Sequence, residues 1–225
     1  MAGPVVCRDG SIAPVRGLYW KWAESWMWSA PLPAASEESL AFRSPERIRE
    51  FQAGRHAAQA LLKSLGSDHP FLPVTRDRRP VWPFGWVGSI SHSREECIVV
   101  VGSKDAYRAV GVDIEPVRNL SEKVTRMIAT DHEHQWLSRV RPRSQQRVAR
   151  LLFSAKESFY KCFYNTFGEE INFREVSFSI DPAGHRLHYR YERPGAFYAG
   201  MFDFKGEYWQ ERGHFVTLFW AQLAH

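Results

Sequence analysis

The stretch Val110-Gly111-Val112-Asp113-Ile114-Glu115 predicts a buried strand that carries two carboxylates. Side chains alternate between the two faces of a strand, so Asp113 and Glu115, which are two residues apart, lie on the same face. Two carboxylates held close together repel each other unless a cation balances their charge. We therefore expect a cation-binding site on this strand.

A second stretch, Phe153 to Lys161, reads Phe-Ser-Ala-Lys-Glu-Ser-Phe-Tyr-Lys and predicts a helix. Residues four apart on a helix share a face, which places Glu157 beside Lys161. The same spacing is typical of an ordinary ion pair on a helix surface. Together with Asp113 and Glu115, however, Glu157 supplies a third carboxylate. Mg²⁺ takes oxygen ligands and shares them between carboxylates, waters and substrate phosphates, so the sequence predicts a metal-assisted phosphate site.

The charge balance of the chain favours an anionic partner. The 225 residues include 30 Lys and Arg against 25 Asp and Glu, which gives a net charge of +5 and a pI near 9.2. Such a balance suits nucleic acid, a phosphorylated ligand or an acidic protein, and it is equally typical of a solvated basic surface. The aromatic segment 17–33 carries Lys21 as its one basic residue. Because a base-stacking platform needs interleaved basic residues, we expect no nucleic-acid partner.

The cysteines indicate a reducing compartment. Cys7, Cys97 and Cys162 are widely spaced and odd in number, a pattern typical of free thiols rather than a disulfide scaffold. No stretch approaches the roughly 18 apolar residues of a membrane span, and Arg8 and Asp9 precede any apolar segment suited to a signal peptide. We expect a cytoplasmic protein without a membrane span.

A long helix is predicted between Ser44 and Gly66. Ser44 and Pro45 form an N-cap and first-turn pair, and Gly66 supplies the stop. Arg55 falls within the apolar stripe of this helix. An inward-facing arginine either meets an anion or extends past the edge of the core to reach water, and the spacing alone favours neither alternative.

The remaining elements are read from their periodicity. Strands are predicted over 86–91 and 97–102, a helical stretch over 121–140 and a long helix over 143–167, after which the tail alternates in period two as an antiparallel sheet does.

Within the stretch 121–140, the quartet Asp131-His132-Glu133-His134 resembles a metal-binding tract. Its two histidines diverge by about 200° on a helix, so we interpret the quartet as a solvated face.

These elements predict an α+β fold. Each half of the chain supplies a long helix and a set of strands, and the boundary falls near residues 103–109. We predict an N-terminal subdomain over residues 1–105 and a C-terminal subdomain over residues 106–225.

Five motifs together resemble the 4'-phosphopantetheinyl transferase family, closest to its enterobactin-type and surfactin-type members. The motifs are Gly54-Arg55-His56-Ala57-Ala58, Arg79-Pro80-Val81-Trp82-Pro83, Gly88-Ser89-Ile90-Ser91-His92-Ser93, Val110-Gly111-Val112-Asp113-Ile114-Glu115, and Phe153-Ser154-Ala155-Lys156-Glu157-Ser158 with Lys161. They follow the family order at family-like spacing. Phe153 stands where the family usually has tryptophan, and the first and last fifty or so residues match only in general character.

The resemblance implies a pseudo-twofold pair of similar α/β subdomains, each with a long helix packed on a small, mainly antiparallel sheet. Coenzyme A would bind in the cleft between them. A serine hydroxyl of an apo carrier protein would attack the β-phosphate of coenzyme A, take up phosphopantetheine and release adenosine 3',5'-bisphosphate.

The resemblance also implies the roles of the site residues. The Mg²⁺ ligands would be Asp113, Glu115 and Glu157. The groups that bind the phosphates of coenzyme A would be Arg47, Arg55, Arg79, Ser91 and His92, with Lys156 and Lys161 neutralising the pyrophosphate. The catalytic residues would be Asp113, Glu157 as the candidate base and Lys161 as an aid to the leaving group.

The partners implied are coenzyme A and an acidic apo carrier protein of the acyl, peptidyl or aryl type, from fatty-acid, siderophore, polyketide or nonribosomal peptide synthesis. A pseudo-twofold chain needs no dimer to complete its site, so we expect a monomer. Two alternatives remain open: a Mg²⁺-dependent phosphohydrolase that uses water in place of the serine, and a non-catalytic nucleotide-binding module. A nucleotide-binding module would not explain the three carboxylates, because such a group repels phosphates unless a metal ion is bound.

Overall fold

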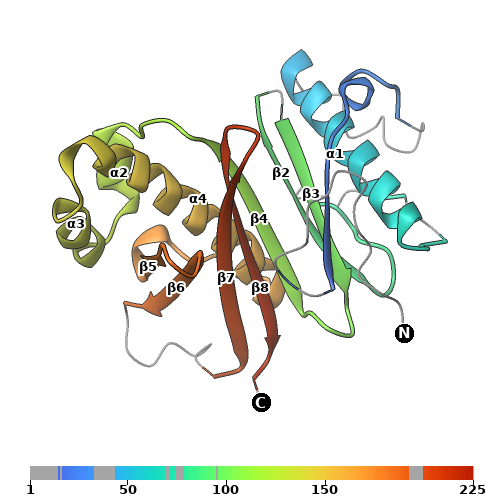
Figure 1. Cartoon of the computed structure of the whole chain (residues 1–225). Helices are drawn as coiled ribbons and strands as arrows, with labels where there is room; N and C mark the ends of the chain where they lie inside the picture. Colours follow the sequence, from blue (N-terminus) through green and yellow to red (C-terminus); the bar gives the residue numbers. More distant parts are fainter. Residues whose placement is uncertain are drawn as a thin grey trace.

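A computed structural model of the chain describes residues 15, 17–32, 44–68, 71–73, 79–94, 96–192 and 200–224 (Figure 1). Cys7 lies outside the described residues. Antiparallel strands and helices follow one another in runs in the described part, which confirms the α+β prediction. The elements are β1 (Leu18–Trp22), the 3-10 turn η1 (Ser25–Trp28), α1 (Pro45–Ser64), β2 (Trp86–Ser93), β3 (Glu96–Ser103), β4 (Ala109–Pro116), α2 (Glu122–Ile128), α3 (Asp131–Ser138), α4 (Pro142–Phe167), the 3-10 turn η3 (Phe173–Glu175), β5 (Val176–Asp181), β6 (Arg186–Tyr191), β7 (Phe202–Glu211) and β8 (His214–Leu223).

The strands form two antiparallel sheets. The first has the order β1-β3-β2, and the second has the order β4-β8-β7-β6-β5. The chain passes from one sheet to the other between Ser103 and Ala109. Helix α1 packs on β3 of the first sheet, and α4 packs on β4 and β8 of the second. Each sheet therefore has one long helix on one of its faces (Figure 1).

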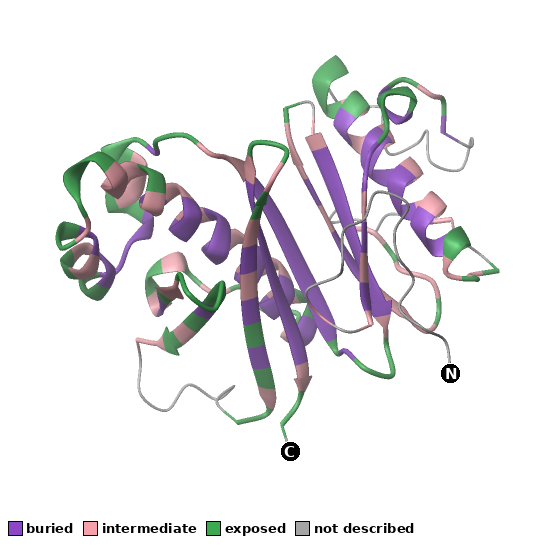
Figure 2. Ribbon diagram, in the orientation of Figure 1, coloured by how far each residue is buried: buried purple, intermediate pink, exposed green. Residues whose placement is uncertain are grey.

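Strand β4 is covered on both of its faces because it lies between these layers. Val110, Val112 and Ile114 pack with residues of β1, β3 and β8 in one cluster. The opposite face carries Gly111 and Asp113, and it lies against α4. Figure 2 shows the resulting band of buried residues through the centre of the molecule. The predicted alternation of this strand is thus confirmed.

The two long helices have the ends that the sequence predicts. In α1, the Ser44 hydroxyl accepts a hydrogen bond from the Arg47 amide at 3.4 Å, and Pro45 occupies the first turn. Gly66 follows the helix with φ of +83°. Helix α4 ends at Gly168, whose φ of +76° gives the left-handed C-cap that glycine adopts without steric cost.

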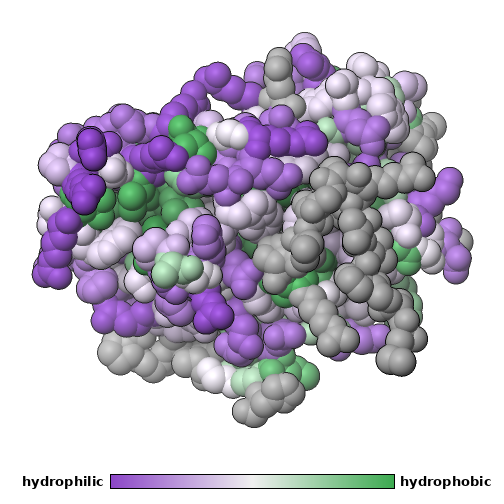
Figure 3. Space-filling model, viewed as in Figure 1, coloured by the Kyte–Doolittle hydropathy of each residue, from purple (hydrophilic) through white to green (hydrophobic). Residues whose placement is uncertain are grey.

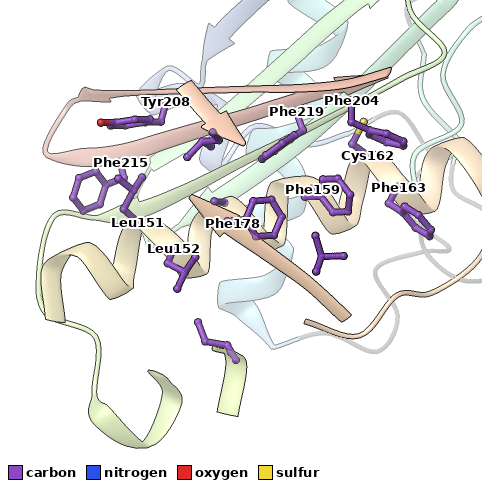
Figure 4. Packing of buried hydrophobic residues seen from close by; sticks show 14 of the residues in the cluster. Leu151, Leu152, Phe159, Cys162, Phe163, Phe178, Phe204, Tyr208, Phe215 and Phe219 are labelled. Carbon is purple, nitrogen blue, oxygen red and sulfur yellow. The ribbon is translucent and has the colours of Figure 1, made fainter. Parts of the chain in front are cut away.

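The inner face of α4 is dominated by phenylalanine. Phe159 has ring contacts with Phe178 and Phe219, each with centroids 5.3 Å apart, and Phe163 continues the cluster one turn later (Figure 4). Aromatic pairs at such separations stabilise beyond the area that they bury. This packing fixes the rotation of α4 and therefore the side chains that its other face directs at β4.

The prediction of one helical stretch over 121–140 is wrong in detail. The stretch forms two helices, α2 and α3, separated by Ala129 and Thr130. Thr130 caps α3 in a reciprocal capping box with Glu133, and a new N-cap ends the preceding helix because its backbone is extended. The signal Thr-x-x-Glu is present in the sequence at this point.

The surface seen in Figure 3 is mostly hydrophilic, with small hydrophobic patches among the helices that follow β4. Among the described helices, none combines the length and the apolar composition needed to cross a membrane.

Gly111 permits the close approach of β4 to α4. A Cβ atom on Gly111 would collide with the carbonyl oxygen of Ser158 and lie 2.5 Å from the amide nitrogen of Cys162. We expect Gly111→Ala to destabilise the protein by at least about 3 kcal/mol, because backbone atoms of α4 would have to move. The measurement is the free energy of unfolding in urea.

Gly66→Ala is the matched control, since a Cβ atom there meets nothing within 4 Å and the substitution strains only the local φ. A loss of stability in Gly111→Ala no larger than in this control would contradict the close-packing account.

Candidate active site

The candidate active site lies where the two sheets meet, at β2 and β4. The Ser89 hydroxyl accepts a hydrogen bond from the Val112 amide at 3.1 Å, and the Ser91 hydroxyl accepts one from the Ile114 amide at 3.3 Å. Both contacts advance by two residues in the same direction, so the strands run parallel. Serine side chains here supply the acceptors that a neighbouring backbone supplies within a sheet.

Asp113 is the centre of the site. Its buried carboxylate accepts hydrogen bonds from Ser91 of β2 at 3.0 Å and from Ser154 of α4 at 2.9 Å. The ammonium of Lys161, also on α4, lies 2.8 Å away. These charged and neutral donors replace the water that the carboxylate loses on burial. Asp113 therefore ties β2, β4 and α4 together.

Lys161 is held by three acceptors. Besides Asp113, its ammonium donates to the Val112 carbonyl at 3.0 Å and to the Ser91 hydroxyl at 3.2 Å. The side chain remains 28% exposed, and it lines a cavity of about 350 Å³ together with Arg79 and Tyr160. Lys161 thus presents positive charge to a space large enough for part of a ligand.

Glu115 lies on the same face of β4 as Asp113, as predicted, and meets α4 one turn before Ser154. Its carboxylate forms an ion pair with Arg150 at 2.6 Å. Burial raises the pKa of Glu115, and the charge of Asp113 raises it further, while Arg150 opposes the shift. The rise of two residues along a strand is close to that of one helical turn, so two successive carboxylates of β4 meet two successive turns of α4.

Glu157 completes the set of carboxylates. It is half-buried, and burial raises its pKa; the charges of Asp113 and Glu115 add to the rise, and Lys161 opposes it. Because the charges of Asp113 and Glu115 both change the pKa of Glu157, the three carboxylates lie close enough for their charges to interact. Carboxylate oxygens are the donors that Mg²⁺ prefers, so the donor set fits the predicted metal.

The side chains do not form a closed set of ligands as they stand. Among the residues that the structure describes, no three histidine, cysteine, aspartate or glutamate side chains are grouped to hold a metal ion. Asp113 is paired with Lys161 and Glu115 with Arg150. Ligation of one ion by the predicted trio would require these side chains to reorient.

Two of the residues predicted to bind phosphate are engaged within the protein. Ser91 is buried, and its hydroxyl donates its one proton to Asp113. The side chain of Lys156 is 1% exposed. It points into the C-terminal half, where it donates to the carbonyls of Phe173 at 2.6 Å and Val176 at 2.7 Å.

The partner of Lys156 is Glu133, a residue that the sequence reading placed on a solvated face. The Glu133 carboxylate is fully buried and lies 3.0 Å from the Lys156 ammonium. It also accepts hydrogen bonds from the amides of Thr130 and Phe178. The signal available in the sequence was the capping box at Thr130, which turns Glu133 back toward the helix start.

A smaller cavity of about 230 Å³ gathers the predicted residues of the first subdomain, Arg47, Arg55 and His92. Arg55 is 3% exposed, and its guanidinium lies 4.7 Å from the centre of the Phe51 ring. Burial lowers its pKa to about 10, and its Nε atom has no hydrogen-bond partner. A buried guanidinium with an unused donor is well suited to an anion.

His92 and Arg47 both contact Glu50. The Nδ1 atom of His92 lies 3.4 Å from one carboxylate oxygen of Glu50, and Arg47 forms an ion pair with the other at 2.8 Å. Burial lowers the pKa of His92, with Glu50 opposing the shift and Lys161 adding to it. Glu50 was not singled out in the sequence, because a carboxylate in an amphipathic helix carries no distinguishing signal.

Arg79 lies in the larger cavity, with its guanidinium 4.5 Å from the centre of the Tyr164 ring. Pro80 and Ile90 line both cavities, so the two adjoin along β2. The structure thus places Arg47, Arg55, Arg79, His92 and Lys161 along two adjoining cavities, and Lys156 lines neither of them.

Comparison with known proteins shows the family of the chain. Two family models match the chain, the 4'-phosphopantetheinyl transferase N-terminal domain over residues 36–102 and the 4'-phosphopantetheinyl transferase superfamily over residues 109–217. The chain belongs to the 4'-phosphopantetheinyl transferase superfamily, which confirms the resemblance read from its motifs.

Individual relatives carry the same description. The chain is 34% identical over 177 residues to 4'-phosphopantetheinyl transferase Svp of Streptomyces mobaraensis, covering 77% of this chain and 72% of the relative. It is 35% identical over 159 residues to PptT of Mycobacterium tuberculosis, covering 68% of each. Enterobactin synthase component D of Escherichia coli is 34% identical over 119 residues, which cover 52% of this chain and 54% of that protein.

A solved structure of Thermotoga maritima holo-acyl-carrier-protein synthase matches more distantly. It has 22% identity and a TM-score of 0.39, and the match covers 51% of this chain and 62% of that chain. The family membership of this protein rests on the sequence matches.

The buried Glu133–Lys156 pair generates a stability prediction. We expect Lys156→Met to lower the free energy of unfolding by about 3–5 kcal/mol, because it leaves the Glu133 charge buried without a partner. The double variant Glu133→Gln/Lys156→Met is expected to be more stable than Lys156→Met alone, since the unpaired charge is gone. Urea unfolding of the four members of the cycle measures this coupling.

The opposite result would support the predicted role of Lys156 at the pyrophosphate. If Lys156→Met kept the wild-type free energy of unfolding and raised the KM for coenzyme A, the lysine would act on the ligand, and its pair with Glu133 would contribute nothing to stability.

Proposed function

We propose that the protein transfers 4'-phosphopantetheine from coenzyme A to a serine hydroxyl of an apo carrier protein. The observation that carries this proposal is the position of Lys161, which pairs with Asp113 and lines a cavity together with Arg79, in a chain of the 4'-phosphopantetheinyl transferase superfamily. The charges of Asp113, Glu115 and Lys161 all act on Glu157, and carboxylates beside cations suit a pyrophosphate substrate held with a divalent cation.

The cleft has separate cations for the separate phosphates of coenzyme A. Arg47, Arg55 and His92 lie together in the smaller cavity and are assigned to the 3'-phosphate. Arg79 and Lys161 line the larger cavity and are assigned to the pyrophosphate. Arg55 is the strongest of these assignments, since it is buried with a donor unused.

The proposed metal ligands are Asp113, Glu115 and Glu157. When bound, Mg²⁺ supplies positive charge that offsets the negative charge developing on the transferred phosphate and on the leaving group. Without it, Lys161 and Arg150 hold the first two carboxylates in place.

The reaction forms a bond between the serine oxygen and the β-phosphorus of coenzyme A. The bond from that phosphorus to the oxygen bridging the two phosphates breaks, and adenosine 3',5'-bisphosphate leaves with the electron pair. Lys161 offsets the charge on the departing oxygen. Glu157 accepts the serine proton, directly or through one water.

The acceptor assigned here is an acidic carrier protein, in keeping with the net charge of +5. Buried free thiols at Cys97 and Cys162 suit a reducing cytoplasm, where we place the protein. We assign it as a monomer, since both halves of the cleft come from one chain.

Transfer is tested by intact mass spectrometry of apo acyl, peptidyl and aryl carrier domains incubated with the protein, coenzyme A and Mg²⁺. We expect a gain of one phosphopantetheine that EDTA abolishes. Asp113→Ala and Glu157→Gln are expected to remove the gain.

Because folding raises the pKa of Glu157 above its ordinary 4.5, its ionised form destabilises the metal-free fold at neutral pH. Glu157→Gln should therefore raise the melting temperature in EDTA. This difference should shrink as the pH falls through the raised pKa and vanish below the ordinary value of 4.5.

The Mg²⁺-dependent phosphohydrolase is the result to exclude. Release of adenosine 3',5'-bisphosphate without any change in the mass of the carriers would establish hydrolysis in place of transfer. Full transfer by Glu157→Gln would remove Glu157 from both of its proposed roles.

Arg55 is tested through substrate affinity. We expect Arg55→Ala to raise the KM for coenzyme A at least about tenfold, since a charge-assisted hydrogen bond contributes on the order of 1.5–3 kcal/mol, with a smaller change in kcat. Lys63→Ala, an exposed cation near the end of the same helix, is the control and should leave KM unchanged. Equal KM values in Arg55→Ala and the wild type would remove Arg55 from the coenzyme A site.

A further inference from the structure

Glu50 is a carboxylate in a cavity whose other ionisable side chains are basic. It lines the smaller cavity of about 230 Å³ together with Arg47, Arg55 and His92, the residues assigned to the 3'-phosphate of coenzyme A. Glu50 is only 8% exposed. A carboxylate close to a phosphate repels it, and burial removes the water that would hydrate the carboxylate. Glu50 would therefore weaken the site unless it also acts on the groups that bind the ligand.

The packing of α1 does not require a charged side chain at this position. Ala53, Gly54 and Ala57 follow Glu50 at the spacing that shares one helix face, and all three are buried. A Cβ atom on Gly54 would lie 2.9 Å from the side chain of Ile90, so small residues already bring α1 close to β2. An apolar residue in place of Glu50 would suit this buried stripe equally well.

Both partners of Glu50 belong to the candidate phosphate site. One of its carboxylate oxygens lies 2.8 Å from the guanidinium of Arg47, and the other lies 3.4 Å from Nδ1 of His92. Arg47 is three residues earlier on α1, whereas His92 lies on β2. Glu50 thus connects two basic side chains from separate elements, with one oxygen for each.

Glu50 restricts the side chain of Arg47. The arginine side chain is 58% exposed, whereas that of Glu50 is 10% exposed. A long, exposed side chain loses rotamer freedom when it binds a ligand, and this loss weakens binding. Because the Glu50 carboxylate is enclosed, the ion pair orders the guanidinium before the ligand arrives.

Glu50 also determines how the imidazole of His92 is used. With Nδ1 turned toward the carboxylate, Nε2 is the nitrogen that remains for a ligand. Burial lowers the pKa of His92, and the charge of Glu50 is the largest effect that opposes this shift. The carboxylate therefore favours the protonated ring, which is the form that attracts a phosphate.

The other groups around His92 come from three elements. Arg47 of α1 and Lys161 of α4 lower the pKa of the imidazole, and Asp113 of β4 raises it. Cys97 pairs with His92 across β3, and burial raises the pKa of its thiol to about 12, so that Cys97 is uncharged. Among these groups, Glu50 has the largest effect on the charge of the ring.

We propose that Glu50 is a positioning residue for coenzyme A, whose carboxylate holds the Arg47 guanidinium and the His92 imidazole in the orientation that binds the 3'-phosphate. This inference rests on the proposed function, which supplies the ligand. Glu50 acts only through these two neighbours, since a carboxylate makes no favourable contact with a phosphate.

The sign of the effect of Glu50→Gln on binding tests the proposal. Removal of a negative charge would by itself strengthen the binding of coenzyme A, whereas loss of positioning would weaken it, because an amide holds the two basic groups less strongly than a carboxylate does. We expect Glu50→Gln to raise the Kd for coenzyme A at least about fivefold, or about 1 kcal/mol, in calorimetric titrations with Mg²⁺. An unchanged or lower Kd would overturn the proposal.

A matched ligand and a matched variant are the controls. The ligand 3'-dephospho-coenzyme A lacks only the phosphate assigned to this cavity, so its Kd should change less than about twofold in Glu50→Gln. Glu46→Gln alters an exposed carboxylate on the same helix that lines neither of the two cavities, and it should bind coenzyme A as the wild type does. Equal weakening for both ligands, or equal weakening by both variants, would overturn the proposal.

The pH dependence of binding is a readout that a merely structural role would not change. The Kd for coenzyme A should rise as the pH rises through the pKa of His92, because the ring loses its charge. Since Glu50 raises that pKa, the midpoint should move to lower pH in Glu50→Gln. The 3'-phosphate titrates near pH 6 but is the same in both experiments, so the difference reports on the protein. Coincident midpoints would overturn the action of Glu50 through His92.

A double-mutant cycle with Arg47→Ala tests the other route. We expect Glu50→Gln to weaken coenzyme A binding less in the Arg47→Ala background than in the wild type, because one of its two targets is already absent. An equal effect in both backgrounds would overturn the action of Glu50 through Arg47.

These binding measurements are independent of transfer and therefore separate the two proposals. Coenzyme A binding that depends on Glu50, without any gain in the mass of the carriers, would support positioning and overturn the transferase assignment. Transfer by the wild type with an unchanged Kd in Glu50→Gln would do the reverse. The absence of coenzyme A binding by the wild type would overturn both.

Discussion

The buried carboxylate of Asp113 is the constraint on which the site depends. Burial of an ionised group is tolerated only where charge and hydrogen bonds replace the lost water, and here Ser91, Ser154 and Lys161 supply them from two other elements. The charge that suits Asp113 to a cation site is thus the same charge that holds β2, β4 and α4 in register. The Asp113 carboxylate therefore contributes both to the packing of these elements and to the candidate cation site.

The geometry of β4 on α4 extends that constraint to the other carboxylates. Gly111 allows the backbones to approach closely, and the similar rise of two strand residues and one helical turn sets Asp113 against Ser154 and Glu115 against Arg150. Glu157 follows on the same helix face. Burial and the charges of Asp113 and Glu115 raise the pKa of Glu157, so its ionised form destabilises the fold at neutral pH.

The cations near β2 differ in their exposure. Arg55 is buried and Lys161 is half-buried, whereas Arg47, Arg49, Arg94 and Arg118 are exposed. Enclosed charge interacts strongly with a nearby group, and exposed charge acts over a longer range.

The sequence by itself determined the elements whose signals are local. Alternation placed Asp113 and Glu115 on one face of β4, caps fixed the ends of α1 and α4, and helical spacing put Glu157 beside Lys161. The motifs also carried the family. Only the tertiary structure decided which side each helix presents to the cleft. Lys156 is about 100° around α4 from Glu157, and the phenylalanine packing of that helix turns it toward Glu133. The cavity lined by Arg49, Arg94 and Arg118 was equally hidden, because these arginines come from separate segments that only the tertiary structure brings together.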